Sequence, residues 1–334
     1  MAQWRAITLS LLSKRNGFLE QCQQDTERVV QEIYSTLASL LPPPAYLERQ
    51  IIDFLRKVIR QAVQLSIEMR TQRAEYIMLP PLQPEYDTNG DLVSKVYFNA
   101  SLMNEHSSET ASNEELEAYG TVVKIVLFPI VVKKGDDLGE GDDEIVVCPA
   151  QVIVAKPATS KNVVRALSGV IDIDHPVRKA HSKVLPMTKR SGESTSNKEL
   201  EESAAKEDSS FLTVRGEDYF DSACQQLCQH VQQWVLRFSK FSDTKACRLS
   251  SDISDEKIET RLNNTILDGS DVDLLLVDRV KRWNIFMSVV MTIIWEYVFT
   301  QYLFGMDREQ RQKLKALEKT LSEVGMYKWR LFNN

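Results

Sequence analysis

The stretch VDLLLVDRVKRWNIFMSVVMTIIWEYVFTQYLFG, residues 272–305, decides how this chain folds. Within it, residues 283–304 carry a single formal charge, Glu296. This apolar segment is long enough to cross a bilayer, which takes about 20 residues. Its polar residues recur every four positions, however, so they form one narrow stripe along a helix: Asn284, Ser288, Thr292, Glu296 and Thr300.

Two interpretations of residues 283–304 follow from that stripe. A central helix of a helical domain explains it, because such a helix meets apolar side chains on most sides and polar groups along one. A membrane helix would bury the Glu296 carboxylate at mid-bilayer, which is expensive without a partner. Basic residues flank both ends, so no charge bias favours insertion. We therefore predict a core helix, capped by Asp271 and ending at Gly305, and keep membrane association as the alternative.

Two amphipathic helices are predicted nearer the amino terminus, over residues 18–41 and 45–75. Apolar side chains recur in both at the three- and four-residue spacing that lines one face of a helix. The three prolines at 42–44 separate them, so we expect an antiparallel pair of helices. Residues 4–12 suggest a short amphipathic helix and lack the features of a secretory signal.

Three strands are predicted in the middle of the chain, over residues 93–100, 120–132 and 145–155. These segments are rich in Val, Ile, Phe and Tyr and are bounded by polar loops. Pro129 should mark a bulge or a sheet edge, because proline donates no backbone hydrogen bond. We expect a three-stranded antiparallel meander covered by the helices, with the acidic loop 135–144 in water.

Residues 157–215 predict a disordered linker, because their apolar density falls and Ser, Lys, Glu and Thr dominate. Its basic stretch at 178–190 is compatible with a nuclear localisation signal, although an ordinary charged linker is the leading interpretation. The helices of the segments on either side, 1–156 and 216–334, each have one apolar face that neither segment could bury by itself. We expect them to form one discontinuous domain.

Helices are predicted again from residue 218 onward, with a shorter one over 253–267 and a charged one over 307–324. The fold class is therefore mainly α with a small antiparallel β-sheet (α+β). In more detail, we expect a helical bundle with a three-stranded meander and a long disordered insertion.

The composition limits the classes of function. The 334 residues are 43% hydrophobic and 26% charged, with a formal net charge of −6. A surface built to neutralise nucleic-acid phosphates would be basic, so a nucleic-acid partner is not expected. Five scattered cysteines suit a reducing compartment, so we expect an intracellular protein of the cytoplasm or nucleus, with membrane as the alternative.

No metal site is predicted. Thiolates and imidazole are zinc ligands, and four candidates lie within a short stretch: Cys224, Cys228, His230 and Cys247. The spacing of the first two is that of one helical turn and differs from structural zinc sites. The acidic loops at 87–91 and 136–144 also fail as helix-loop-helix calcium sites. In the first, Leu92 stands at the glycine position and Phe98 at the glutamate position; in the second, Leu138 and Val147 stand at ligand positions.

No catalytic or cofactor-binding residue is predicted either. The chain has no Gly-x-Ser-x-Gly elbow, no phosphate-binding loop and no dinucleotide-binding fingerprint. Glu296 alone is expected in apolar surroundings that would perturb its pKa. An enzyme with an unrecognised site near Glu296 remains a second alternative.

Three segments carry a resemblance: WRAITLSLLSKR (4–15), LLPPPAYLE (40–48) and the stretch from 293 to 325 that begins IIWEYVFTQYLFG. Together they resemble uncharacterised predicted proteins of filamentous fungi. That group has no assigned activity, so the resemblance implies only a eukaryotic, intracellular setting. The leading hypothesis is a non-enzymatic interaction or scaffold protein with protein partners. Helix 307–324 and the acidic loop 135–144 are the expected contact sites.

Overall fold

The computed structural model describes residues 2–89, 92–106, 111–141, 143–155, 212–241, 246–317 and 319–320. They belong to one compact unit, which joins Met1–Ala155 to Phe211–Asn334. The predicted linker lies outside the described residues as far as residue 211, and its basic stretch 178–190 lies there entirely. The last linker residues are bound by Gln72, whose side chain donates to the Thr213 carbonyl at 3.1 Å and accepts from the Arg215 amide at 2.9 Å.

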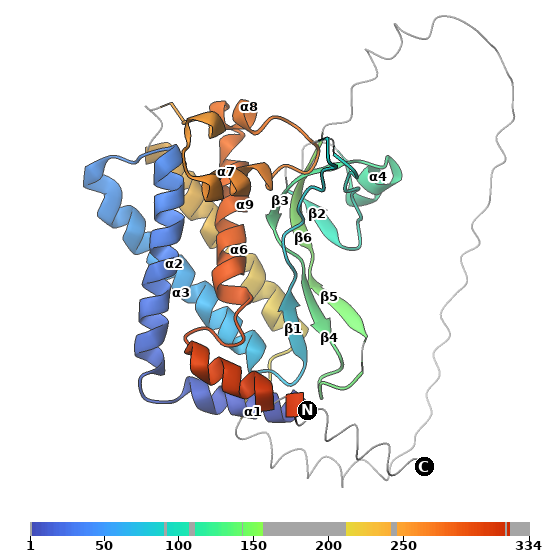
Figure 1. The fold of residues 1–334 in the computed structure, drawn as a ribbon. Helices are drawn as coiled ribbons and strands as arrows, with labels where there is room; N and C mark the ends of the chain where they lie inside the picture. The colour runs from blue at the N-terminus through green and yellow to red at the C-terminus, as the bar shows by residue number, and fades with distance from the viewer. Residues whose placement is uncertain are drawn as a thin grey trace, which may run out of the picture. The chain divides into compact units, whose positions relative to one another are not determined.

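Three helices open the chain: α1 Ala2–Ser13, α2 Phe18–Leu40 and α3 Glu48–Arg70, the last preceded by a 3-10 turn, η1 Ala45–Leu47. As predicted, α2 and α3 pack together across the proline loop and run in opposite directions, crossing obliquely (Figure 1). Their buried side chains repeat every three or four residues, as Val29, Ile33 and Leu37 do in α2.

Four labelled helices follow residue 212: α6 Glu217–Phe241, α7 Glu256–Asn263, α8 Val272–Val277 and α9 Arg282–Ile294. A 3-10 turn, η2 Ser250–Asp252, precedes α7, and a π-helical turn, η3 Trp295–Phe299, follows α9. A further helix covers residues 308–317. Helix α9 lies in the middle of the unit (Figure 1) and contacts α2, α6, α7 and strand β3 (Val123–Phe128). Ten of its thirteen residues are buried, which agrees with the predicted core helix. Among the described residues, no helix is long and apolar enough to cross a bilayer.

The predicted single helix from Asp271 to Gly305 is wrong at both ends. At its start, the chain is broken between α8 and α9. Asp271 does cap a helix, accepting a hydrogen bond from the Asp273 amide at 2.8 Å, but that helix, α8, ends at Val277. The Asp278 side chain then accepts hydrogen bonds from the backbone amides of Val280 and Lys281, at 2.9 and 3.2 Å, and these bonds form a turn. The short Asp side chain competes with the helix for backbone donors, so the chain changes direction here.

The predicted helix end at Gly305 is wrong as well, because the helical backbone stops at Phe299 and residues 301–305 form a turn. Gly305 has φ +82°, and a Cβ atom at this position would overlap the Cys22 sulfur, so only glycine fits. Two side chains of α3 donate hydrogen bonds to carbonyl oxygens at the end of η3. Ser66 Oγ donates to the Val298 carbonyl at 3.2 Å, and Arg70 donates to the Phe299 carbonyl at 2.7 Å.

The strands form two small sheets. The first has the order β1-β4-β5 and is antiparallel, with β1 Glu75–Met78, β4 Val131–Lys134 and β5 Glu144–Cys148. The second has the order β2-β6-β3, with β2 Met103–Glu105 and β6 Ala150–Val154, and β2 pairs with β6 in parallel. A second small core joins this sheet to a short helix, α4 Asn113–Ala118, through Leu116, Val126 and Val152.

The predicted fold class, mainly α with a small β component, is confirmed, but the single antiparallel meander is wrong. Segment 120–132 splits at Pro129 into β3 and β4, and segment 145–155 splits at Pro149 into β5 and β6. At both prolines the chain passes from one sheet to the other, because proline has no amide to continue a ladder. Segment 93–100 forms no strand and makes only an isolated bridge, from Tyr97 to Val122.

Candidate functional site

Glu296 lies in η3 at a junction of three helices. Its carboxylate accepts a hydrogen bond from Arg261 of α7 at 2.6 Å, and Arg261 also donates to Glu32 of α2 at 2.7 Å. Lys257, one turn earlier in α7, donates to Glu32 at 2.7 Å and to the Tyr297 hydroxyl at 2.9 Å. We call these five residues the Arg261 network. It links elements that are more than 200 residues apart in sequence.

The apolar surroundings expected for Glu296 are not found, since its side chain is 46% exposed and paired with Arg261. Burial disfavours the charge of Arg261, but its hydrogen bonds to Glu32 and Glu296 outweigh burial and raise its pKa. Burial likewise acts to raise the pKa of Glu32, and the bonds from Arg261 and Lys257 lower it overall. Glu32 and Arg261 are therefore fixed charges at neutral pH, unsuited to exchanging protons. The network is a structural clamp.

A polar groove of about 290 Å³ lies beside the network, between α2 and residues 248–258. Two of its hydroxyls, those of Ser35 and Ser39, already donate to α2 carbonyls at 3.2 and 2.7 Å. The described residues that line it include no histidine or cysteine. They supply no nucleophile paired with a base, the arrangement that acyl or phosphoryl transfer through a covalent intermediate requires.

The four residues weighed as zinc ligands do not converge. Cys224 and Cys228 are buried in α6, where Cys224 hydrogen-bonds Cys148 of β5, whereas His230 is on the exposed side of that helix. Burial raises the pKa of Cys228 to about 12 and that of Cys247 to about 11, so both stay protonated at neutral pH. Nowhere in the described part of the chain do three or more His, Cys, Asp or Glu side chains lie close enough together to hold a metal.

The acidic loop 135–144 joins β4 to β5, and part of its charge is used within the fold. Asp136 accepts hydrogen bonds from two amides of its own loop, at 2.9 and 2.8 Å. Asp137 accepts from the buried Lys133 at 2.5 Å, and Lys133 also donates to Glu217 of α6 at 2.8 Å. These contacts hold the loop against α6. The other described carboxylates of the loop remain available to a partner.

A group of exposed apolar side chains lies where the sequence predicted a buried helix. Leu274 and Val277 of α8 and Val280 in the following turn are 71%, 65% and 74% exposed. Their three-residue spacing places the first two on one side of α8, whereas Leu276 on the opposite side is fully buried. We call these three residues the α8 corner. The signal that could have revealed it is Asp278, which ends α8 and prevents it from continuing into the core.

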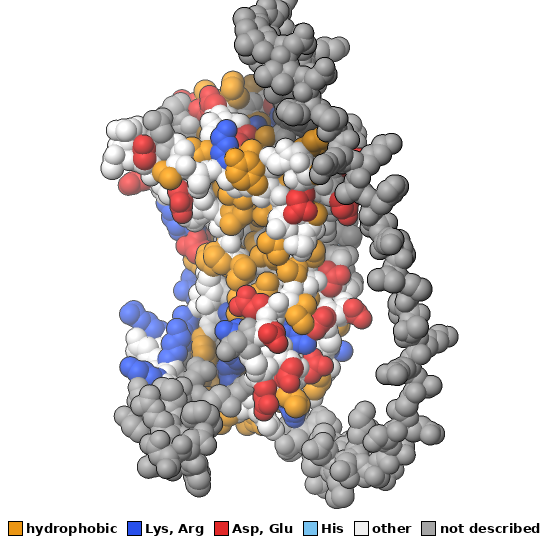
Figure 2. Space-filling view, turned by 90° about the vertical axis from the view of Figure 1, so that its right-hand side faces the viewer, with side chains coloured by type: hydrophobic (Ala, Val, Ile, Leu, Met, Phe, Trp, Pro, Cys, Tyr) orange, Lys and Arg blue, Asp and Glu red, His pale blue; other side chains and the backbone are white. Residues whose placement is uncertain are grey.

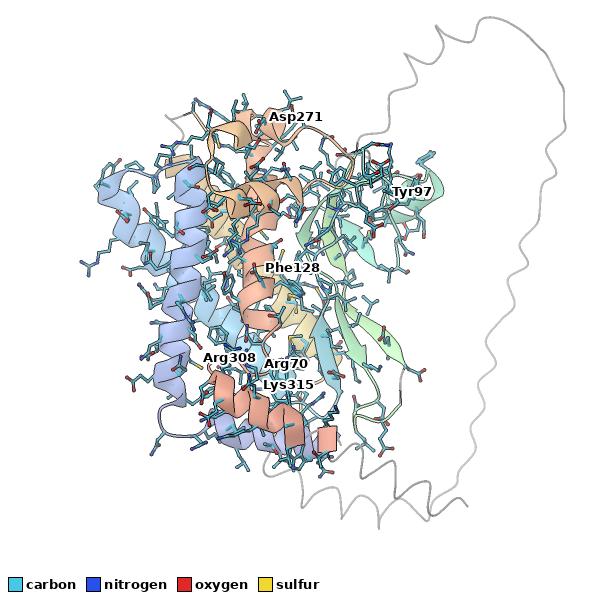
Figure 3. The ribbon with its side chains drawn as sticks, viewed as in Figure 1. Arg70, Tyr97, Phe128, Asp271, Arg308 and Lys315 are labelled. Atoms are coloured by element: carbon cyan, nitrogen blue, oxygen red, sulfur yellow. The ribbon has the colours of Figure 1, made fainter. Side chains whose placement is uncertain are left out.

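The charged helix predicted over 307–324 is helical over residues 308–317, and residues 321–324 lie outside the described part. Its apolar residue Leu314 packs against a small cluster formed by Leu9, Leu303 and Met306. Figure 3 shows Arg308 and Lys315 on this helix where it crosses α1. The helix is therefore held to α1 by one apolar side and displays charge on the other.

Comparisons with known proteins add one relative. No protein-family profile matches the chain, and no solved structure matches it. Leashin of Aspergillus fumigatus is 70% identical to this chain over 155 residues, which are 46% of this chain and 3% of Leashin. The chain thus matches a small part of a much longer protein. The resemblance to proteins of filamentous fungi is confirmed.

Proposed function

We propose that this chain is a non-enzymatic, intracellular protein-interaction module that acts as a scaffold element. The observation that carries the proposal is the α8 corner. Its three large apolar side chains, at positions 274, 277 and 280, are each about two-thirds or more exposed, and grouped exposed apolar side chains are typical of an interaction site.

The α8 corner is held in place before any partner arrives. Asp271 caps the helix, and Leu275 and Leu276 anchor its inner side in the core. A rigid surface loses little conformational entropy on binding, which favours affinity. This rigidity supports the proposal that the α8 corner is a contact site.

The charge around the corner indicates the partner's chemistry. Residues 268–281 contain four aspartates and two basic residues, and one of the latter, Lys281, pairs with Asp278 at 3.1 Å. Figure 3 shows Asp271 at this end of the molecule. An apolar segment flanked by Lys or Arg would match both the exposed leucine and valines and the acidic rim.

Two further observations support the proposal. The apolar residues of α9 are used in the core, so they meet neither lipid nor substrate in the folded chain. All five cysteines are free and buried, which suits a reducing compartment.

The test is capture of partners from an extract of a filamentous fungus, with and without detergent, using the full chain as bait. The bait is compared with a triple variant, Leu274→Ser, Val277→Ser and Val280→Ser. A matched control changes three equally exposed residues elsewhere: Tyr46→Ser, Val93→Ser and Tyr119→Ser. We expect a set of proteins that is retained by the bait and the control and lost from the α8-corner variant. Capture of no protein above background, or equal capture by the variant, would overturn the proposal.

A further inference from the structure

The end of the molecule formed by α1, the α1–α2 turn and helix 308–317 carries an excess of positive charge. Segments 2–20 and 302–320 contain eight Lys and Arg against four Asp and Glu, in a chain of net charge −6. Figure 2 shows Lys and Arg side chains grouped at one edge of this end and Asp and Glu grouped toward the other. We call the first group, with the two segments that carry it, the basic end.

The fold, not the sequence, brings these two segments together. Leu9 of α1 is buried against Leu303 and Met306, and Leu12 and Leu314 pack on the same cluster. Contacts between residues nearly 300 positions apart therefore fix the basic side chains of both segments on one surface. Like charges held close together repel one another, and the binding of an oppositely charged partner offsets this repulsion.

Several of these cations have no acidic partner. Arg15, Arg308 and Lys315 are exposed and form no ion pair with any described residue. Arg311, between Arg308 and Lys315 on the same helix, donates to the Met306 carbonyl at 3.2 Å, so its guanidinium bonds a neutral oxygen. Exposed cations without an acidic partner are free to pair with the carboxylates of another molecule.

A hollow of about 180 Å³ adjoins these cations, between the α1–α2 turn and the start of helix 308–317. Its lining is mixed: apolar side chains come from Leu12, Phe18 and Met306, and polar ones from Arg15, Asn16, Gln21, Asp307 and Gln310. A volume of about 150 Å³ is enough to hold a benzene ring. The hollow therefore has room for one aromatic or branched side chain, which would contact Leu12, Phe18 and Met306.

We propose that the basic end binds an acidic segment of a partner protein. The segment places one apolar side chain in the hollow and its carboxylates against the exposed cations Arg15, Arg308 and Lys315. Charge complementarity and the hollow together favour a peptide over an anionic bilayer, since a flat lipid surface offers no single side chain to fill the hollow. The basic end shares no residue with the α8 corner, so the two proposals stand or fall separately.

The test uses the folded full chain and a fluorescent peptide of glutamates with a central Phe-Leu pair, followed by fluorescence anisotropy. Arg15→Glu, Arg308→Glu and Lys315→Glu together should weaken binding by about tenfold or more, because they replace attraction by repulsion. The corresponding glutamine variant should give an intermediate loss, and the α8-corner triple variant should bind normally. Circular dichroism checks that each variant is folded.

Two matched probes complete the experiment. A peptide with Ser-Ser in place of Phe-Leu should bind about tenfold more weakly, because it lacks the anchor. Vesicles of phosphatidylserine should compete poorly with the Phe-Leu peptide. Equal binding by the charge-reversed chain, equal binding of the Ser-Ser peptide, or binding to the vesicles alone would overturn the proposal.

Discussion

Helices α8 and α9 come from one apolar run, yet they differ in what surrounds them. Helix α9 lies between α2, α6 and strand β3, and its side chains Phe286, Val290 and Ile293 are fully buried. Helix α8 packs mainly on α9, so only its inner side is covered. The comparison shows that apolar composition supplies the tendency to be buried, while the number of neighbouring elements decides whether a given side chain is buried.

The largest difference between the two helices should be seen on truncating a core side chain. Phe286→Ala removes a ring packed edge-to-face on Phe238 at 6.1 Å between centroids, and should lower the free energy of unfolding by about 3–5 kcal/mol. Urea denaturation measures the change. The matched control on α8 is Leu274→Ala, which should change stability by no more than about 0.5 kcal/mol. Equal losses of unfolding free energy in the two variants would contradict the difference in burial between α9 and α8.

The end of the apolar run should be nearly as sensitive. Gly305→Ala forces a side chain into left-handed backbone and against Cys22, and should cost about 3 kcal/mol. Thermal unfolding with and without Cys22→Ala tests the cause. The second substitution removes the sulfur and should restore part of the loss. If Gly305→Ala is as stable as the parent, the close packing of α2 on this turn is wrong.

The Arg261 network ties η3, at the end of α9, to α2 and α7, and no such network is found around the described residues of α8. Arg261→Met should lower stability by about 2 kcal/mol at neutral pH, since it removes two hydrogen bonds between charged groups. Lys240→Met, at an exposed position, is the control and should have little effect.

The pH dependence of the Arg261→Met effect follows from Glu32. Its pKa is lowered in the fold, so its ionised form stabilises the protein above the ordinary value near 4.5, and this stability is lost as pH falls through the lowered value. The difference between parent and variant should therefore shrink below about pH 4. Urea unfolding across that range measures it, and a constant difference would exclude Glu32 as the cause.

The break between α8 and α9 can be tested directly. Asp278→Ala removes the acceptor of two backbone amides and should cost about 1 kcal/mol, the usual loss at a helix-capping position. Asp278→Asn keeps a side-chain acceptor and should cost less. Urea unfolding ranks the three proteins, and an alanine variant as stable as the parent would mean that Asp278 does not cause the break.

The smallest effect on stability is expected at the α8 corner itself. Val277→Ser replaces a side chain that is 65% exposed and should change the free energy of unfolding by no more than about 0.5 kcal/mol. The buried counterpart, Val290→Ser, introduces a hydroxyl into the core and should be clearly destabilising. A large loss in the Val277 variant would mean that the corner is part of the core and would remove the basis of the proposed contact site.

The spacing of residues along the chain predicted the helices, but it did not predict the features that depend on contacts between distant segments. The spacing of Val29, Ile33 and Leu37 predicted α2, and the missing side chain of Gly305 predicted the end of the apolar run. The composition of segment 93–100 predicted a strand, but no neighbouring segment pairs with it beyond one bridge. Glu296 seemed isolated in sequence because Arg261, its partner, is 35 residues away.

By itself, the sequence determined where most helices lie, that Pro129 interrupts the second predicted strand, and that a core helix is the leading interpretation of residues 283–304. These features depend on side chains within a few residues of one another, so they can be read along the chain. Only the tertiary structure decided which apolar and charged side chains remain exposed. The α8 corner and the basic end depend on how many elements pack around a residue, and that number is set by contacts between segments hundreds of residues apart.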